Sequence, residues 1–382
     1  MTTTVDSAIS PAVSTTQSHP WPLFGLLNLI VVVALSIGSW YLLADPQTSP
    51  WDFYPLPFNA ALFWSIVFIV FIGFNCEFAG FDRIPQPWRG SVVLVSTALF
   101  GIAATWLLSP GLGELYPDFA SDREAGLGYF AGALFVLFGF GTWVMAALNW
   151  NHWPWTGLGM KQPLAGLCEI AFVAIPTLAL YFTLGLPAVS LSATNPLMSI
   201  DTVLGWFYSI VVCVIFTGQT LDNWPWRSFA SSSKRWLMPL TATIGNAALG
   251  TALYFVMVSV AKFLVGQSNV DELGAVINQF PAQIGVCWVL WMVLWANAFG
   301  NRPTRYGDSV NFAVRAVVTL TLGVATFLFY YKFAAGHILH EPPIAGSLYG
   351  NALGFIDWLV LWTLLYVVGF QSWGLRRLTP AP

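Results

Sequence analysis

Ten apolar segments, each long enough to cross a lipid bilayer, constrain this chain more than any other feature. A bilayer core about 30 Å thick requires about 20 apolar residues per helix, and backbone groups in lipid must hydrogen-bond within their own segment. The sequence therefore predicts an all-α polytopic membrane protein with ten transmembrane helices. The segments lie near residues 23–44, 60–80, 90–109, 127–149, 163–185, 202–221, 237–265, 280–299, 311–333 and 351–373.

Composition supports a membrane protein and argues against several other classes. A soluble domain carries about 25% charged residues, whereas this chain of 382 residues carries 8% and is 57% hydrophobic. The net charge of −3 and the scattered positive charges predict no nucleic-acid partner. Four cysteines lie in different apolar segments without C-x-x-C spacing, so neither a disulfide framework nor a cysteine metal site is expected. These are Cys76, Cys168, Cys213 and Cys287.

The distribution of charge predicts the orientation in the cell membrane. Of the 14 Lys and Arg residues, eleven follow even-numbered segments, begin the ninth segment or lie in the C-terminal tail. They are Arg83, Arg89, Lys161, Arg227, Lys234, Arg235, Arg302, Arg305, Arg315, Arg376 and Arg377. The loops on the other side are acidic, with Asp45, Asp52, Glu114, Asp118, Asp122, Glu124, Asp271 and Glu272. The positive-inside rule then places both termini in the cytoplasm.

The two ends of the chain are predicted to be cytoplasmic tails. Residues 1–20 are rich in Thr and Ser and contain no Lys or Arg. The apolar run after them is also too long for the core of a signal peptide. We therefore expect a disordered tail at 1–20, a single transmembrane domain at 21–374 and a second tail at 375–382.

A recurring Trp-Pro motif divides the transmembrane domain into similar units. Asn149–Gly157 reads N-W-N-H-W-P-W-T-G, and Leu221–Ser228 reads L-D-N-W-P-W-R-S. Five prolines mark the units at intervals of 65, 67, 71 and 78 residues, namely Pro22, Pro87, Pro154, Pro225 and Pro303. Such spacing predicts internal repeats near 21–82, 83–150, 151–222, 223–299 and 300–374. Two helices per unit make all units point the same way, as five parallel helical hairpins.

Ten helices arranged as five parallel hairpins resemble the tellurite-resistance/dicarboxylate transporter family and the related plant slow anion channels. The resemblance implies hairpins around a central pore with a gating aromatic residue, and odd-numbered helices that line the pore and carry proline kinks. In this chain Pro176 is the clear mid-span proline among the odd-numbered segments. No sequence motif matches, so the resemblance concerns the fold alone and assigns no residue.

Every even-numbered segment carries an amide near its cytoplasmic end. Polar side chains in membrane helices face a neighbouring helix or a cavity. Two interpretations stay open: interhelical hydrogen bonds that fix the packing, or a ring of amides along the path of a polar solute. The amides are Asn75, Asn149, Gln219, Asn297 and Gln371, with Asn223 and Asn301 one turn after two of them.

Three acids lie within or at the edge of predicted spans, namely Glu169, Asp357 and Glu77. An ionised carboxylate at the bilayer centre costs roughly 2.5–3.5 kcal/mol, so such residues face protein or water. A buried carboxyl that titrates near neutral pH can couple transport to protons. Glu169 is the first candidate for this role and Asp357 the second, and a structural carboxylate is the alternative for each.

The last outer loop contains one pattern that fits a metal site. His337, His340 and Glu341 have i, i+3, i+4 spacing, which converges if the turn is helical. Pro342 and Pro343 follow at once and limit such a helix, so an ordinary loop is the alternative. No cofactor is predicted. The chain has no P-loop, G-x-S-x-G, H-E-x-x-H or Rossmann glycine pattern, so an enzyme is not the leading expectation.

The sequence favours a permease or channel for a small polar or weakly charged solute, with proton coupling as one option. Two other classes stay open. The first is a membrane subunit or scaffold of an enzyme complex, and the second is an intramembrane enzyme acting on an apolar substrate. The expected partners are the lipid bilayer and a small solute, with a homo-oligomer or a membrane complex also open.

Overall fold

The computed structural model describes residues 20–230 and 234–375. This part of the chain has ten helices long and apolar enough to span a membrane, which confirms the predicted all-α multi-pass class. The tails predicted at 1–20 and 375–382, with Arg376 and Arg377, lie outside the described residues except for their innermost residue.

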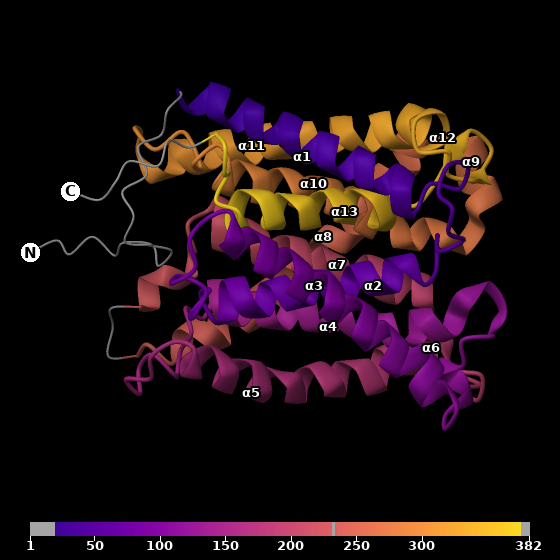
Figure 1. The fold of residues 1–382 in the computed structure, drawn as a ribbon, viewed down its shortest axis with the longest axis horizontal. Helices are drawn as coiled ribbons and strands as arrows, with labels where there is room; N and C mark the ends of the chain where they lie inside the picture. The colour runs from indigo at the N-terminus through magenta and orange to yellow at the C-terminus, as the bar shows by residue number, and fades with distance from the viewer. Residues whose placement is uncertain (1–19, 231–233, 376–382) are drawn as a thin grey trace, which may run out of the picture.

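The spans run roughly parallel to one another (Figure 1). The first six are α1 (Trp21–Leu43), α2 (Phe58–Val70) with η1 (Phe71–Asn75), α3 (Trp88–Trp106) with η2 (Leu107–Gly111), α4 (Leu127–Leu148), α5 (Leu164–Leu180) with η5 (Tyr181–Gly185) and α6 (Leu186–Val189), and α7 (Ile200–Ile215) with η6 (Phe216–Thr220). The last four are α8 (Leu237–Val265), α10 (Phe280–Asn297), α11 (Asp308–Phe329) with η9 (Tyr330–Ala334) and α12 (Ala335–His337), and α13 (Ala352–Thr363) with η10 (Leu364–Gly369).

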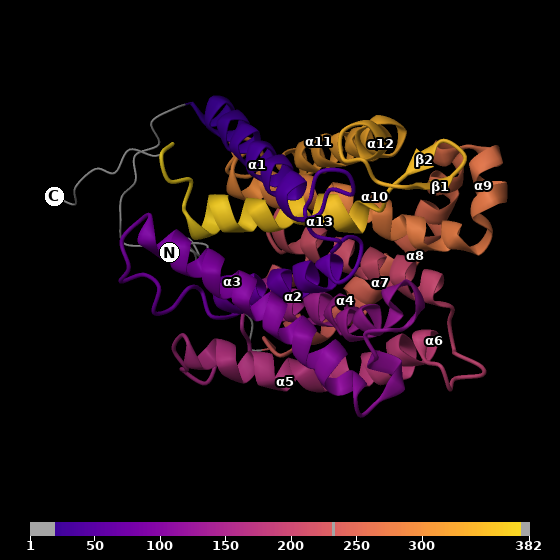
Figure 2. The same cartoon turned by 45° about the vertical axis from the view of Figure 1, so that its right-hand side comes forward.

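Short elements fill the connections between the spans. They are the 3-10 turns η3 (Pro117–Phe119), η4 (Glu124–Gly126), η7 (Trp226–Phe229) and η8 (Gly274–Gln279), the helix α9 (Gln267–Leu273) and the strands β1 (Pro343–Ala345) and β2 (Leu348–Tyr349). The strands pair antiparallel, with Pro343 opposite Tyr349, and lie beside α9 (Figure 2). We call the end of the bundle with Pro87, Pro154 and Pro303 the proline end. The opposite end, which holds α9 and the strands, is the loop end.

The even-numbered spans form an inner ring. Between 61% and 78% of their residues are buried inside the protein, compared with 22% to 28% in the odd-numbered spans. α2 contacts α4, α4 contacts α7, α7 contacts α10 and α10 contacts α13. Contact between α13 and α2 closes the ring. The resemblance implied a pore lined by odd-numbered helices, but here these helices lie outside, and Pro176 belongs to the outer helix α5.

Each outer helix lies against more than one inner span. α3 contacts α2, η10 and α4, α5 contacts α4 and η1, α8 contacts α7, α10 and α4, and α11 contacts α10 and η6. α1 contacts α13, and its Gly25 lies against Phe299 after α10. Small residues permit this close approach, as in other membrane helix pairs. A Cβ on Gly166 of α5 would lie 2.3 Å from the carbonyl oxygen of Asn75.

All five inner spans end in the same backbone conformation at the proline end. Two consecutive residues there have positive φ. In four of these turns the backbone N–H of the second residue bonds a carbonyl six residues earlier, as His152 donates to Ala146 at 3.3 Å. In the remaining turn Asn223 donates to Gly218, five residues earlier, at 3.1 Å. The pairs are Glu77–Phe78, Asn151–His152, Asp222–Asn223, Gly300–Asn301 and Gln371–Ser372. These turns place polar side chains between neighbouring helices.

Candidate functional site

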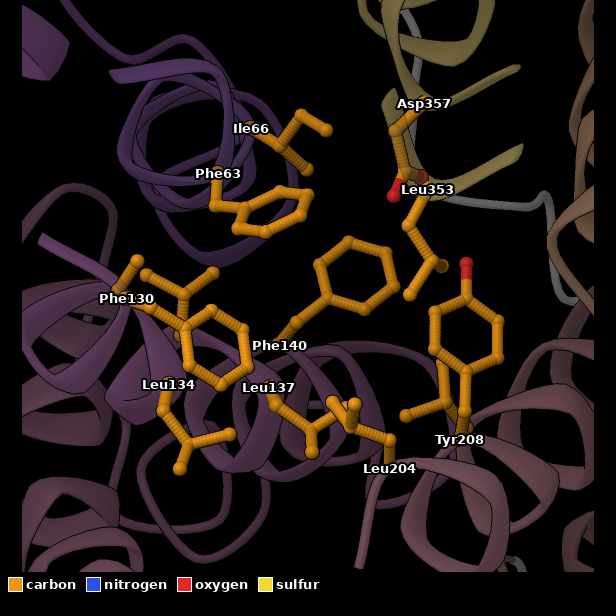
Figure 3. A pocket seen from close by; sticks show the side chains of 13 residues that line it. Phe63, Ile66, Phe130, Leu134, Leu137, Phe140, Leu204, Tyr208, Leu353 and Asp357 are labelled. Carbon is orange, nitrogen blue, oxygen red and sulfur yellow. The ribbon is translucent and has the colours of Figure 1, made fainter. Parts of the chain in front are cut away.

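A cavity lies inside the inner ring. Side chains of α2, α4, α7 and α13 surround it, among them Phe63, Phe140, Leu204 and Leu353 (Figure 3). Its volume is about 60 Å³ for the centres of water-sized molecules. One such centre requires roughly 10–15 Å³, so the cavity can hold a few waters or one small solute.

One carboxyl and one hydroxyl are the polar groups of this central cavity. Asp357 of α13 is 7% exposed, and Tyr208 of α7 points its hydroxyl toward it (Figure 3). The other side chains that line the cavity in the described structure are apolar. An unpaired charge in such surroundings costs several kcal/mol. The Asp357 carboxyl therefore requires either a proton or a cationic or hydrogen-bonding partner inside the cavity.

Glu169 lies elsewhere, in a buried cluster at the proline end. Its Oε1 accepts a hydrogen bond from Asn75 Nδ2 at 2.5 Å, and its Oε2 lies 3.1 Å from His152 Nδ1. Glu77 approaches the other ring nitrogen of His152 at 3.4 Å. η1 supplies Asn75, the turn after it supplies Glu77, the turn after α4 supplies His152, and α5 supplies Glu169. The structure thus brings together three residues that the sequence had singled out separately.

His152 is the member of this cluster that sequence reasoning missed. Burial lowers its pKa, but the hydrogen bond to Glu169 and the negative charges of Glu169 and Glu77 outweigh burial, so the net shift is upward. A protonated imidazole would pair with the buried carboxylate of Glu169, while Glu77, the second carboxylate, is partly exposed. The cluster can hold or release a proton, and it also ties α5 to the ends of two inner spans.

Asn149 lies in a second cluster, made of amides and a hydroxyl. Its Nδ2 donates to Thr217 Oγ1 and to Asn223 Oδ1, both at 3.2 Å. Its Oδ1 accepts from Asn246 Nδ2 of the outer helix α8 at 3.2 Å. These bonds join α4, α8 and η6 with the turn after it, so their evident effect is on helix packing. Asn246 was not among the residues predicted from the sequence, although a single amide inside an apolar span could have indicated it.

The third cluster is ionic. Asn301 Nδ2 donates to the backbone oxygen of Gln219 at 2.8 Å and to Asp222 Oδ1 at 2.9 Å. Arg315 of the outer helix α11 is 3% exposed and lies 2.7 Å from the other oxygen of Asp222. The two other predicted amides are placed differently. Asn297 donates to the Val293 carbonyl of its own helix at 2.7 Å, and Gln371 belongs to the turn after η10.

The predicted amides therefore do not meet around one cavity. Asn75, Asn149 and Asn301 lie in three separate clusters between helices, and within the described structure none of the predicted amides lines the central cavity. Of the predicted candidates, Asp357 alone lines this cavity as the structure describes it.

The three residues predicted as a metal site have different partners. His340 Nδ1 lies 2.8 Å from Asp45 Oδ1, and the ring of His337 packs against Phe333. Glu341 instead accepts hydrogen bonds from tyrosine hydroxyls. Among residues 20–230 and 234–375, no group of three or more His, Cys, Asp or Glu side chains is placed to hold a metal ion.

Comparison with protein-family models, curated proteins and solved structures finds no match to this chain. The function must therefore be argued from the geometry. The residues that matter most in that geometry and were absent from the sequence candidates are Tyr208, Tyr54, Tyr330 and His152. An isolated Tyr or His in an aromatic-rich chain carries no pattern, so only the fold could pair it with a carboxyl.

Proposed function

We propose that this integral membrane protein is a permease or channel for a small solute, with its path through the central cavity past Asp357. The observation that carries the proposal is a closed ring of five buried spans, four of which line a cavity whose acid is Asp357. The apolar lining suits a small solute with one polar or weakly charged group. That group would replace Tyr208 or a proton as the partner of the carboxyl.

Proton coupling follows from the environment of Asp357. If a solute with a hydrogen-bond donor or a positive charge enters, it compensates the carboxylate and allows the proton to leave. If the solute leaves, a proton must return, because the unpaired charge is too costly in an apolar cavity. Asp357 thus becomes the first candidate for the coupling residue. Glu169, which is paired with His152, becomes a residue for packing or for proton exchange at the proline end.

We also propose that the five hairpins are parallel repeats, with the proline end and both termini in the cytoplasm of a cell-membrane protein. The equal backbone turns at the proline end support the repeat. Gln86 and Gln162 support it further, since each donates to a backbone oxygen of an inner span at 2.9 Å. Each also accepts from the N–H of the glycine four residues later, at 3.2 and 3.1 Å. The charge asymmetry between the two ends supports the orientation.

Flux through vesicles tests the proposal. Purified protein would be reconstituted in liposomes and supplied in turn with acetate, methylammonium and urea as an anionic, a cationic and a neutral small solute. We expect flux of at least one of them, with a rate that depends on pH, and we expect Asp357→Asn to remove that pH dependence.

Asp308→Asn is the matched control, because Asp308 is an exposed acid whose partner is Arg227 at the surface. Equal flux and equal pH dependence in Asp357→Asn and the control would refute the role of Asp357. No flux above empty vesicles, together with stoichiometric partner chains in mild detergent, would favour a membrane subunit or scaffold instead.

A further inference from the structure

Glu341 is a buried carboxyl at the loop end that the central cavity does not explain. It is 3% exposed and lies just before β1. Its Oε1 accepts from the hydroxyl of Tyr330 at 2.6 Å. Its Oε2 accepts from the hydroxyl of Tyr54 and from the backbone N–H of Asn351 at 3.1 Å. Residues from three separate segments therefore converge on one carboxyl.

The backbone around Glu341 is shaped to permit these contacts. Gly350 has φ of +76°, and a Cβ there would lie 2.6 Å from Glu341 Oε2 and 2.7 Å from the Tyr330 hydroxyl. Any other residue would be strained and would collide with both groups. The site is therefore built by the fold, and it places a carboxyl directly under the surface loops.

Burial raises the pKa of Glu341 to about 7, although the three hydrogen bonds oppose that shift. The groups that donate to it are neutral hydroxyls and a backbone N–H, and the adjacent His340 contacts Asp45 instead. Lys332 and Glu272, on the adjoining elements, are exposed. The surrounding titratable and charged groups are Tyr54, Tyr330, Tyr331, the pair His340–Asp45, Lys332 and Glu272.

Buried polar groups continue from Glu341 toward the cavity. The N–H of Ala352, next to Asn351, donates to the hydroxyl of Tyr331 at 3.4 Å, and that hydroxyl donates to Gln283 Oε1 of α10 at 2.9 Å. Tyr331 and Gln283 are 1% and 2% exposed. Tyr331 and Gln283 thus form a second buried polar pair, which lies beside the Glu341 site through the adjacent backbone N–H groups of Asn351 and Ala352.

The same pair approaches Asp357. The buried Cys287 lies one turn after Gln283 on α10, near both Tyr331 and Asp357. Asp357 follows Ala352 by five residues on α13, which is about 7.5 Å along the helix axis at 1.5 Å per residue. The remaining gap to the Asp357 carboxyl would have to be bridged by water.

We propose that Glu341 is the group at which protons enter from the loop end on their way to Asp357. The inference rests on the proposed function, in which Asp357 exchanges a proton for the solute. A hydronium ion gives its proton to a Glu341 oxygen and becomes water. Glu341 then releases this proton and returns to its carboxylate form, and a carboxylate oxygen of Asp357 takes up the proton. Tyr331 and Gln283 supply the hydrogen-bond partners along the route.

The test follows the protonation of Asp357 itself, so no solute has to be known. Full-length protein would be placed in phosphatidylcholine vesicles with the loop end outward, and the outside would be acidified in a stopped-flow cell. The infrared absorption band of a protonated carboxyl reports the protonation of Asp357. The band is assigned to Asp357 because it should be lost in Asp357→Asn. We expect Glu341→Gln to slow its appearance by about tenfold or more, because positioned proton donors typically contribute 10²–10⁴-fold.

Two comparisons distinguish a proton route through Glu341 from a purely structural role of Glu341. In vesicles with the proline end outward, Glu341→Gln should leave the rate of Asp357 protonation unchanged. Glu272→Gln replaces an exposed acid of the loop end and should leave that rate unchanged in both orientations. Equal slowing in both orientations, or no slowing in either, would overturn the proton route. Absence of an Asp357 band that responds to pH would instead refute the proposed function on which the route depends.

Discussion

Replacement of Glu341 by glutamine should change how the stability of the protein depends on pH. The carboxyl has a pKa of about 7 in the fold, against an ordinary value of 4.5. Between these values the folded protein keeps a proton that the unfolded chain releases, so raising the pH through this window lowers the free energy of unfolding. At 1.36 kcal/mol per pH unit, the difference of 2.5 (7 minus 4.5) amounts to about 3 kcal/mol.

Thermal unfolding in detergent, followed by tryptophan fluorescence from about pH 5 to about pH 8, measures this effect. Wild-type protein should lose stability as the pH rises. Glu341→Gln should lose about 3 kcal/mol less, because the amide has no charge to desolvate. Its one oxygen can accept from Tyr54 and Asn351, and its NH2 can donate to the hydroxyl oxygen of Tyr330. Glu272→Gln, the exposed control, should follow the wild type. Parallel curves for wild type and Glu341→Gln would show that the carboxyl is not buried as the structure describes.

Two further changes probe the proline end. Gly166→Ala should destabilise the protein by about 1–3 kcal/mol, because the new methyl group meets the Asn75 backbone oxygen and the backbone has little room to move; Gly38→Ala, which meets nothing within 4 Å, is the control in the same unfolding assay. His152→Gln should destabilise the protein at low pH more than at high pH. The raised pKa of His152 means that its pairing with Glu169 contributes fully below the ordinary histidine pKa and is lost above the folded one. A pH-independent loss in this variant would contradict the ion pair.

The ten spans were predictable from the sequence because length and apolarity are local properties. The seventh span was expected at 237–265 and is found at Leu237–Val265, and the eighth was expected at 280–299 and α10 covers Phe280–Asn297. Inner and outer spans could not be told apart in this way. Lipid and protein interior are both apolar, so a helix such as α8 shows no hydrophobic face that marks its neighbours.

The candidate residues were predictable as polar groups inside spans, but their partners were not. Asn75, Glu77 and Glu169 were each singled out, and the fold adds His152 between the two carboxylates from a turn whose left-handed backbone the sequence did not indicate. The pattern of amides in the sequence was compatible with two interpretations. Hydrogen bonding between helices and the lining of a path both require an amide near a helix end, so only the packing could show which groups meet.

Energetics distinguish a polar group that holds helices together, such as Asn149, from a polar group in the cavity, such as Asp357. Asn149 bonds to three side chains on neighbouring elements, and interhelical hydrogen bonds of this kind stabilise membrane proteins by about 0.6–2 kcal/mol each. Asp357 is placed differently. It joins no cluster between outer and inner helices, its partner is one hydroxyl across a cavity, and an apolar pair of the same shape would be about as stable or more so. A chain that only had to hold ten helices together would gain nothing from a carboxyl in its central cavity. Under the proposed function, the cost of Asp357 is offset by a partner that enters and leaves the cavity, either a solute or a proton.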